Sequence, residues 1–409
     1  MSRTEQLLGV DVPPAHAPVS TMRIAIIVNM VAPYTTPLFA KLAERPECEL
    51  LVVSETLMER DRAWAPETSL PFEHVLLDSW TVDLAPLAIG SGFKTRFDTY
   101  FYVPKRPLAP LRAFSPDVVV GGGGGIWSSP ANIAALAARR WRDWAFVPWW
   151  GSFSRPRPTL PRRLAEPWVK TFMRASDAWL VYGTRQAQDA AELGADPART
   201  VIAPITALAP EHMPERPRPE RAGSTRFLFV GRFIERKGLD VLLDAFGRVG
   251  GGELWLVGDG PQREIVEAAA ARDPRIRALG HLQGDPLEHA YQQADVLVVP
   301  SLYEPWGLVV HEGLAHGLPV IVTDQVGAGD DLVDHGRNGF VVSTGSAEEL
   351  TGAMRAISEW APEQWQRAAA RSRETLEAAS IERGVEGFVQ GCALAVEHRR
   401  QLRERNRAD

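Results

Sequence analysis

The sequence contains only two cysteines, Cys48 and Cys392. They lie too far apart for a zinc-type cluster and are too few for a disulfide framework, so we expect a reducing cytoplasm. Long hydrophobic runs are missing too, since none approaches the roughly 20 apolar residues of a membrane span. Residues 1–20 carry Glu5 and Asp11 where a signal peptide needs an apolar core. These absences predict a cytoplasmic protein that is soluble or, at most, attached peripherally to the inner membrane face.

A strong charge of either sign is also lacking. The 409 residues hold 45 Lys+Arg and 51 Asp+Glu, a formal net charge of −6, which argues against a general nucleic-acid binder. With 45% apolar and 23% charged residues, the composition is that of an ordinary globular protein and excludes a disordered or collagen-like chain. The length predicts two or three domains, each able to bury its own core.

The composition differs between the two halves. Nine of the 13 tryptophans precede residue 210. Residues 1–224 carry a net charge of +2, whereas residues 225–409 carry −8. The two halves therefore have different surface chemistry.

Strands and helices are predicted to alternate along most of the chain. Met22–Asn29 is a nearly continuous apolar run, typical of a strand buried on both faces, and residues 116–125 read as a strand that enters a glycine loop. Residues 55–112 suggest irregular or antiparallel pieces. After residue 225 short β-branched strands again alternate with helices. This pattern predicts an α/β protein with two Rossmann-like open parallel sheets facing an interdomain cleft.

Domain boundaries follow from composition. Residues 209–224 contain four prolines and no apolar periodicity, which marks a linker. We therefore expect a flexible tail over 1–20, an N-terminal domain over 21–208 and a C-terminal domain over 225–384. Residues 385–409 form a further predicted helix. The cleft between two such domains is a usual place for a ligand.

The most informative stretch is SLYEPWGLVVHEGLAHGLPVIVTD, residues 301–324. It follows a strand, and Pro305 and Gly307 open a helix whose free amides and positive dipole end favour phosphate. Glu304 precedes that helix and Glu312 lies inside it, so both can face the cleft. Two carboxylates that flank a phosphate site suit a sugar nucleotide, because a carboxylate accepts hydrogen bonds from a vicinal diol.

Two further loops follow strand ends. VGRFIERKG (230–238) places Arg232 and Lys237 after a strand that ends at Gly231, where their charges would neutralise a diphosphate. LVGDGP (256–261) brings Gly258 to another strand end, where glycine permits close backbone approach.

Together these motifs resemble glycosyltransferase family 4, whose members are retaining enzymes of the GT-B fold. GRFIERKG, LVGDGP, VPSLYEPWGLVVHEGLAHGLPVI and DHGRNGFVV carry the resemblance over about 225–385. MRIAIIVN, PYTTPLF, PDVVVGGGG and SDAWLVYGT carry a weaker one in the N-terminal half. Several motifs in the right order make the resemblance specific.

The resemblance implies roles for individual residues. Arg232, Lys237 and Glu304 would be catalytic, with the two cations on the donor diphosphate and Glu304 on hydroxyls of the donor sugar. The implied donor-binding residues are Gly231, Gly258, Pro305, Trp306, Gly307, Leu308, Glu312, Tyr34 and Thr35. Among them, Glu312 would hold the nucleotide ribose, and the amides of Trp306, Gly307 and Leu308 would contact sugar and phosphate. Neither a metal nor another cofactor is implied. The last helix would cross back to the N-terminal domain.

The chain departs from the family in two places. Many members carry a His-acid-Pro motif where this chain has Gly121–Gly125, so no histidine can be given that role. The usual glycine-rich loop after the first strand is replaced by APYTTPLF, in which the amides of Tyr34 and Thr35 would approach the phosphate. Both differences bear on the donor sugar and the acceptor geometry more than on the class of reaction.

Other interpretations of these motifs are weaker. Gly121–Gly125 lacks the last glycine of a dinucleotide fingerprint, because position 126 is isoleucine. His311 and His316 are five residues apart instead of the four of a zincin helix. Glu304 and Glu312 by themselves would be an ordinary helix-cap acid and a surface acid.

Residues 139–174 combine nine Arg/Lys with interleaved tryptophans and only two acidic residues, Asp143 and Glu166. This segment is either a solvated face over buried indoles or a contact for anionic lipid or for the acceptor.

We therefore predict a retaining, metal-independent hexosyltransferase. It would use a nucleoside-diphosphate sugar, with UDP favoured over GDP, and an acceptor hydroxyl on a glycan, a lipid-linked sugar or a natural product. Two alternatives stay open, namely a sugar-nucleotide epimerase of the same fold and a non-catalytic nucleotide-sugar-binding protein.

Overall fold

The computed structural model describes residues 21–58, 69–83, 100–122, 129–153, 160–206 and 225–408. The predicted tail over 1–20, the linker over 209–224 and residues 123–125 of the glycine run lie outside them.

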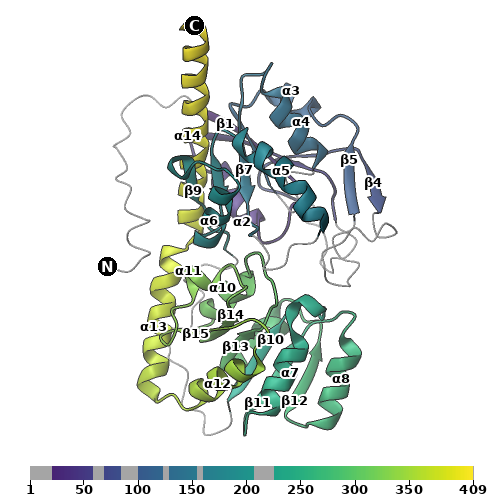
Figure 1. Cartoon of the computed structure of the whole chain (residues 1–409), viewed down its shortest axis with the longest axis vertical. Helices are drawn as coiled ribbons and strands as arrows, with labels where there is room; N and C mark the ends of the chain where they lie inside the picture. Colours follow the sequence, from purple (N-terminus) through teal and green to yellow (C-terminus); the bar gives the residue numbers. More distant parts are fainter. Residues whose placement is uncertain are drawn as a thin grey trace.

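Each half of the chain forms one parallel sheet (Figure 1). The N-terminal sheet has the order β3-β2-β1-β6-β7-β8-β9. Its strands are β1 (Met22–Val28), β2 (Cys48–Ser54), β3 (Glu73–Leu76), β6 (Val118–Gly121), β7 (Ala145–Trp150), β8 (Trp179–Val181) and β9 (Thr200–Ile202). Their residues are buried on both faces along most of β1, β2, β6 and β7, which is why they appear in the sequence as continuous apolar runs.

Helices cover both faces of this sheet. They are α2 (Thr36–Ala43), α3 (Ala109–Phe114), α4 (Pro130–Ala138), α5 (Leu160–Arg174) and α6 (Thr184–Glu192). The region that the sequence left irregular contains the parallel edge strand β3 and a separate antiparallel pair, β4 (Ser79–Asp83) with β5 (Tyr100–Pro104).

The C-terminal sheet has the order β12-β11-β10-β13-β14-β15, the strand order of a doubly wound nucleotide-binding sheet. Its strands are β10 (Arg226–Val230), β11 (Glu253–Val257), β12 (Ile276–Gly280), β13 (Val296–Val299), β14 (Val320–Thr323) and β15 (Gly339–Val342). The helices between them are α7 (Leu239–Gly247), α8 (Arg263–Arg272), α9 (Asp285–Gln293), α10 (Leu308–Ala315), α11 (Gly329–Leu332) and α12 (Ala347–Ser358). In an open sheet of this kind, ligands bind at the carboxyl ends of the strands.

The last two helices connect the domains. Helix α13 (Pro362–Ala378) packs on α10 and α11, and α14 (Ile381–Ala408) then runs along the N-terminal domain against α2, β7 and β9 (Figure 1). The crossing helix begins four residues before the predicted boundary at 385. The Ser380 hydroxyl accepts a hydrogen bond from the Arg383 amide, so it caps the helix at that point.

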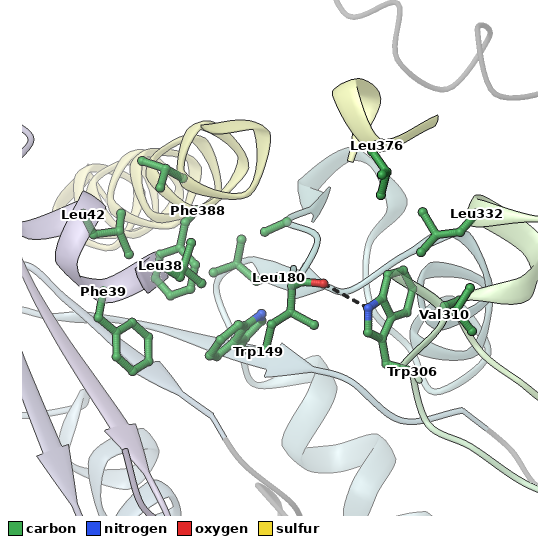
Figure 2. Packing of buried hydrophobic residues seen from close by; sticks show 14 of the residues in the cluster. Leu38, Phe39, Leu42, Trp149, Leu180, Trp306, Val310, Leu332, Leu376 and Phe388 are labelled. Atoms are coloured by element: carbon green, nitrogen blue, oxygen red, sulfur yellow. Dashed lines mark hydrogen bonds between the residues drawn. The ribbon is translucent and has the colours of Figure 1, made fainter. Parts of the chain in front are cut away.

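One hydrophobic cluster extends through both domains (Figure 2). Aromatic rings follow one another from Phe39 to Trp149, Tyr182 and Trp306, with centroid separations of 6.0, 5.3 and 6.1 Å. Phe388 of α14 packs on Trp149 at 5.4 Å. The two domains are therefore joined by a continuous apolar core as well as by the chain.

Candidate donor-binding site

The candidate site lies at the carboxyl ends of β10 and β13, beside the boundary between the domains. After β10, Arg232 begins a loop that ends in a short 3-10 helix, Glu235–Lys237. After β13, the loop that contains Glu304 leads into α10. Gly238 closes the first loop with φ +70°, and a Cβ there would lie 2.1 Å from the Pro300 carbonyl oxygen. Only glycine therefore lets the two loops approach this closely.

Lys237 and Glu304, separated by 66 residues in sequence, form an ion pair here. Their side chains are only 14% and 13% exposed. Burial works against ionisation of Glu304, but the charges of Lys237, Arg236 and Arg232 outweigh it and hold its pKa below the usual value. The predicted catalytic residues are thus brought together as one carboxylate among three cations.

Arg236 was missed by the sequence analysis. It directly precedes the predicted residue Lys237, and its carbonyl accepts a hydrogen bond from the Leu302 amide at 2.8 Å. That bond ties the two loops together. The signal was the run of two cations before Gly238.

The glycines at the strand ends are in close contact. A Cβ on Gly258 would lie 1.9 Å from the Gly231 carbonyl oxygen, and the Gly231 amide donates to the Val257 carbonyl at 3.0 Å. Both predicted glycines therefore serve backbone packing at the edge of the sheet, which keeps this edge open to a ligand.

Gly307 begins α10 in the left-handed region, with φ +101°. The amides of Gly307 and Leu308 lie at the helix start, where the helix offers no carbonyl partner of its own. An anion at this position could accept hydrogen bonds from both amides.

Pro305 and Trp306 are held by the N-terminal domain. The Gln186 side-chain amide donates to the Pro305 carbonyl at 2.6 Å, and the Trp306 indole N–H donates to the Ile205 carbonyl at 3.0 Å (Figure 2). On the other side of Glu304, the Tyr303 hydroxyl donates to the Phe153 carbonyl at 2.9 Å. The loop that carries Glu304 is thus fixed by both domains, which no sequence motif indicated.

Helix α6 contacts the C-terminal domain at its first turn. The Thr184 amide and hydroxyl both donate to Asp331, at 3.0 and 2.6 Å, so a carboxylate of one domain caps a helix of the other. Arg185 pairs with Asp330 through two hydrogen bonds of 2.8 Å. Gly183 allows the contact, because a Cβ there would lie 2.2 Å from an Asp331 carboxylate oxygen.

Glu312 lies one helical turn inside α10 and is partly buried. Burial raises its pKa, opposed by a hydrogen bond from Tyr291 and by the charges of His316 and Lys237. Lys237 therefore influences both Glu304 and Glu312, and the two carboxylates share one site as expected.

Tyr34 and Thr35 have a different environment from the predicted one. The Thr35 amide and hydroxyl both donate to the Ala32 carbonyl, at 2.8 and 2.9 Å, and close the turn before α2. Tyr34 packs against the shared hydrophobic cluster. The Thr35 amide is therefore not available to a phosphate, because the turn already uses it.

The two histidines of α10 have structural surroundings. Burial lowers the pKa of His311 to about 4. His316 contacts Glu288 and the Glu312 carbonyl.

Within the described parts of the chain, no group of three or more His, Cys, Asp or Glu side chains is arranged to hold a metal ion. In the same parts, no helix has the length and apolar character needed to cross a bilayer.

Comparison with known proteins finds similarity over the C-terminal domain. Residues 224–359 match the model of the family "Glycosyl transferases group 1". An uncharacterised glycosyltransferase of Methanocaldococcus jannaschii is 34% identical over 140 residues, which cover 32% of this chain and 36% of that protein. The lipopolysaccharide core biosynthesis glycosyltransferase LpsE of Rhizobium meliloti is 37% identical over 131 residues, 31% of this chain and 38% of that protein. The matches thus span little more than a third of each relative.

The fold likeness covers nearly the whole chain. The structure of HepE from Anabaena, in complex with UDP and glucose, superposes with a TM-score of 0.64 at 14% identity, over 91% of this chain and 99% of that one. UDP and glucose are ligands of HepE, and the likeness establishes the architecture of both domains. This chain therefore has the GT-B fold, and residues 224–359 are similar to the group 1 glycosyl transferases.

Proposed function

We propose that the chain transfers a hexose from a nucleoside-diphosphate sugar, with UDP favoured over GDP, to an acceptor hydroxyl. One observation carries the proposal: a buried carboxylate, Glu304, lies among Lys237, Arg236 and Arg232 beside the start of α10. A diphosphate requires such cations and free amides, and a sugar requires such a carboxylate. The UDP and glucose bound by HepE, which has the same fold, support the donor class.

The roles of these groups follow from the charge that develops. Transfer breaks the bond between the sugar C1 and the diphosphate oxygen and forms a bond from C1 to the acceptor oxygen, while the acceptor proton passes to the departing diphosphate oxygen. Negative charge grows on the diphosphate, where Lys237 and Arg232 stabilise it. Arg236 adds to the same positive field.

Without donor, Lys237 and Glu304 neutralise one another. A bound diphosphate competes for the Lys237 ammonium and thereby releases Glu304 to accept hydroxyls of the donor sugar. Binding of the phosphate and recognition of the sugar are therefore coupled through one lysine.

We also propose that the reaction proceeds with retention and without a metal ion. The acceptor would attack from the face of the leaving group, and the three cations take the place that a divalent ion has in metal-dependent transferases. The acceptor would be a glycan, a lipid-linked sugar or a natural product bound by the N-terminal domain.

The test is a screen of UDP- and GDP-hexoses by mass spectrometry, with and without candidate acceptors and with excess chelator. We expect slow hydrolysis of one donor, unaffected by chelation and abolished in Lys237→Ala. Lys105→Ala is the matched control, since Lys105 pairs with Asp78 on the exposed surface of the N-terminal domain. Epimerised donor without acceptor would contradict the transferase proposal, and full turnover by Lys237→Ala would contradict the assigned site. Anomeric analysis of the product tests retention.

A peripheral contact with anionic lipid is a second proposal, supported by α5. Leu164 and Trp168, four residues apart on this helix, are 73% and 43% exposed, while Phe172 and Met173 are buried against the sheet. Arg163 and Arg174 are exposed on the same helix. An exposed apolar pair with neighbouring cations is typical of a helix that lies on a membrane surface, which would place the protein at the inner face of the cytoplasmic membrane.

Liposome flotation tests this contact. Binding should require anionic lipid, decrease with salt and be lost in the double variant Leu164→Ser, Trp168→Ser. Binding that does not depend on lipid charge or on these substitutions would contradict the proposed membrane contact and indicate an ordinary solvated helix.

A further inference from the structure

Helix α9 supplies a side chain that holds Glu312. The Tyr291 hydroxyl donates to Oε2 of Glu312 at 2.6 Å. Tyr291 is 2% exposed and lies among residues of the shared cluster. Its ring has no freedom to follow a moving carboxylate, so this bond fixes the carboxylate in one orientation.

The tyrosine ring is itself held from one side. His316, one turn after Glu312, stacks on it with a centroid distance of 4.6 Å and an angle of 12°. The His316 ring nitrogens contact the Glu312 backbone carbonyl at 2.7 Å and the Glu288 carboxylate at 2.8 Å. Glu288, His316 and Tyr291 thus form a platform that links α9 to α10 beneath Glu312.

The platform occupies only part of the Glu312 carboxylate. Among the described residues no hydrogen bond is made to Oε1 of Glu312. Ionised carboxylates accept about four hydrogen bonds, so lone pairs on Oε1 remain for a ligand. A glutamate side chain that rotates freely loses rotamer entropy when it binds a diol. Glu312 has already lost that freedom in the folded protein, so binding does not carry this cost.

We infer that Tyr291 is a positioning residue that orients Glu312 for the ribose hydroxyls of the donor nucleotide. The inference rests on the proposed function, because it presumes a nucleotide in this site. The Tyr291 hydroxyl donates to the Glu312 carboxylate, so removing this hydroxyl should weaken the recognition of the ribose and leave the recognition of the base and diphosphate unchanged.

The experiment is calorimetric titration with UDP and with 2′,3′-dideoxy-UDP, with GDP and its dideoxy analogue run in parallel. The proteins are the wild type, Tyr291→Phe, Glu312→Gln and the double variant. Phenylalanine keeps the stack on His316 and removes only the hydroxyl. Tyr102→Phe is the matched control, since it removes another buried tyrosine hydroxyl, in the N-terminal domain.

We expect Tyr291→Phe to weaken UDP binding about tenfold, the range for a hydrogen bond to a charged group. Binding of dideoxy-UDP should not change, and Tyr102→Phe should alter neither nucleotide. In the Glu312→Gln background, Tyr291→Phe should add little, because the two residues act through one contact.

Each contrary result is decisive. Equal UDP affinity in Tyr291→Phe and wild type would overturn the inference, and so would an equal loss for both analogues, which would show a merely structural role. A wild-type protein that binds neither UDP nor GDP would overturn the proposed donor, and that failure is recognised in the wild-type titrations alone. If the guanosine pair binds instead, the same comparison is made with that pair.

Discussion

Asp331 and Asp330 are neighbours in sequence with unequal expected contributions to stability. Asp331 caps α6 across the domain boundary through the amide and hydroxyl of Thr184, and it is partly buried. Asp330 forms an ion pair with Arg185 on the exposed surface, with side chains 36% and 22% exposed. Substitution of each by alanine therefore compares a buried interdomain cap with a surface salt bridge.

The expected magnitudes differ. Loss of a helix N-cap costs about 1 kcal/mol, and leaving the Thr184 hydroxyl without its acceptor adds about 1–2 kcal/mol. Asp331→Ala should thus destabilise by about 2–3 kcal/mol. Asp330→Ala should cost about 0–1 kcal/mol, since exposed ion pairs contribute little.

Urea denaturation followed by tryptophan fluorescence measures both variants under one condition. Asp331→Ala should lower the transition midpoint clearly more than Asp330→Ala does, and it should also reduce donor turnover, because α6 presents Gln186 to Pro305. Equal midpoints for the two variants would refute the argument that the cap fastens the domains.

Three further predictions concern single positions. Gly183→Ala should destabilise the protein and slow donor turnover, because its Cβ would lie 2.2 Å from Asp331 and 2.6 Å from the Trp306 ring. Gly352→Ala is the control, because Gly352 is an exposed position of α12 with open space around it, and equal midpoints would contradict the close approach. Lys237→Met should raise the pKa of Glu304, since it removes the main charge that opposes the effect of burial. The pH dependence of donor binding should then shift to higher pH. An unchanged pH dependence would contradict the role given to the ion pair. Burial raises the pKa of Glu55 from 4.5 to about 7. Its contribution to the free energy of unfolding, about 3 kcal/mol, is therefore fully present below about pH 4.5 and is lost as the pH rises through 7. Glu55→Gln should remove that slope from denaturation curves recorded across this range, whereas an unchanged slope would show that Glu55 is not its source.

Most strands of both sheets were predictable because parallel strands buried on both faces leave continuous apolar runs, whereas the half-exposed edge strand β3 leaves none. The location of Lys237 and Glu304 at one edge of the sheet was predictable because both follow strands whose carboxyl ends meet there, but their ion pair was not predicted. Tyr291 could not be found in this way, since it lies on the side of a helix that otherwise shows ordinary amphipathic spacing. The contacts of Gln186 and Asp331 could not be predicted for a different reason. Their partners lie 119 and 147 residues away in the chain, and no local sequence pattern indicates such a pairing.

The crossing of α14 also concerns the order in which the protein is made. Phe388, Cys392 and Ala395 are fully buried in the shared cluster beside strands that are synthesised some 200 residues earlier. On the ribosome, the N-terminal sheet emerges first but lacks these side chains until α14 is translated. The domain that is made first therefore completes its core last, and a chain that stops before Ile381 leaves an apolar face on that domain exposed.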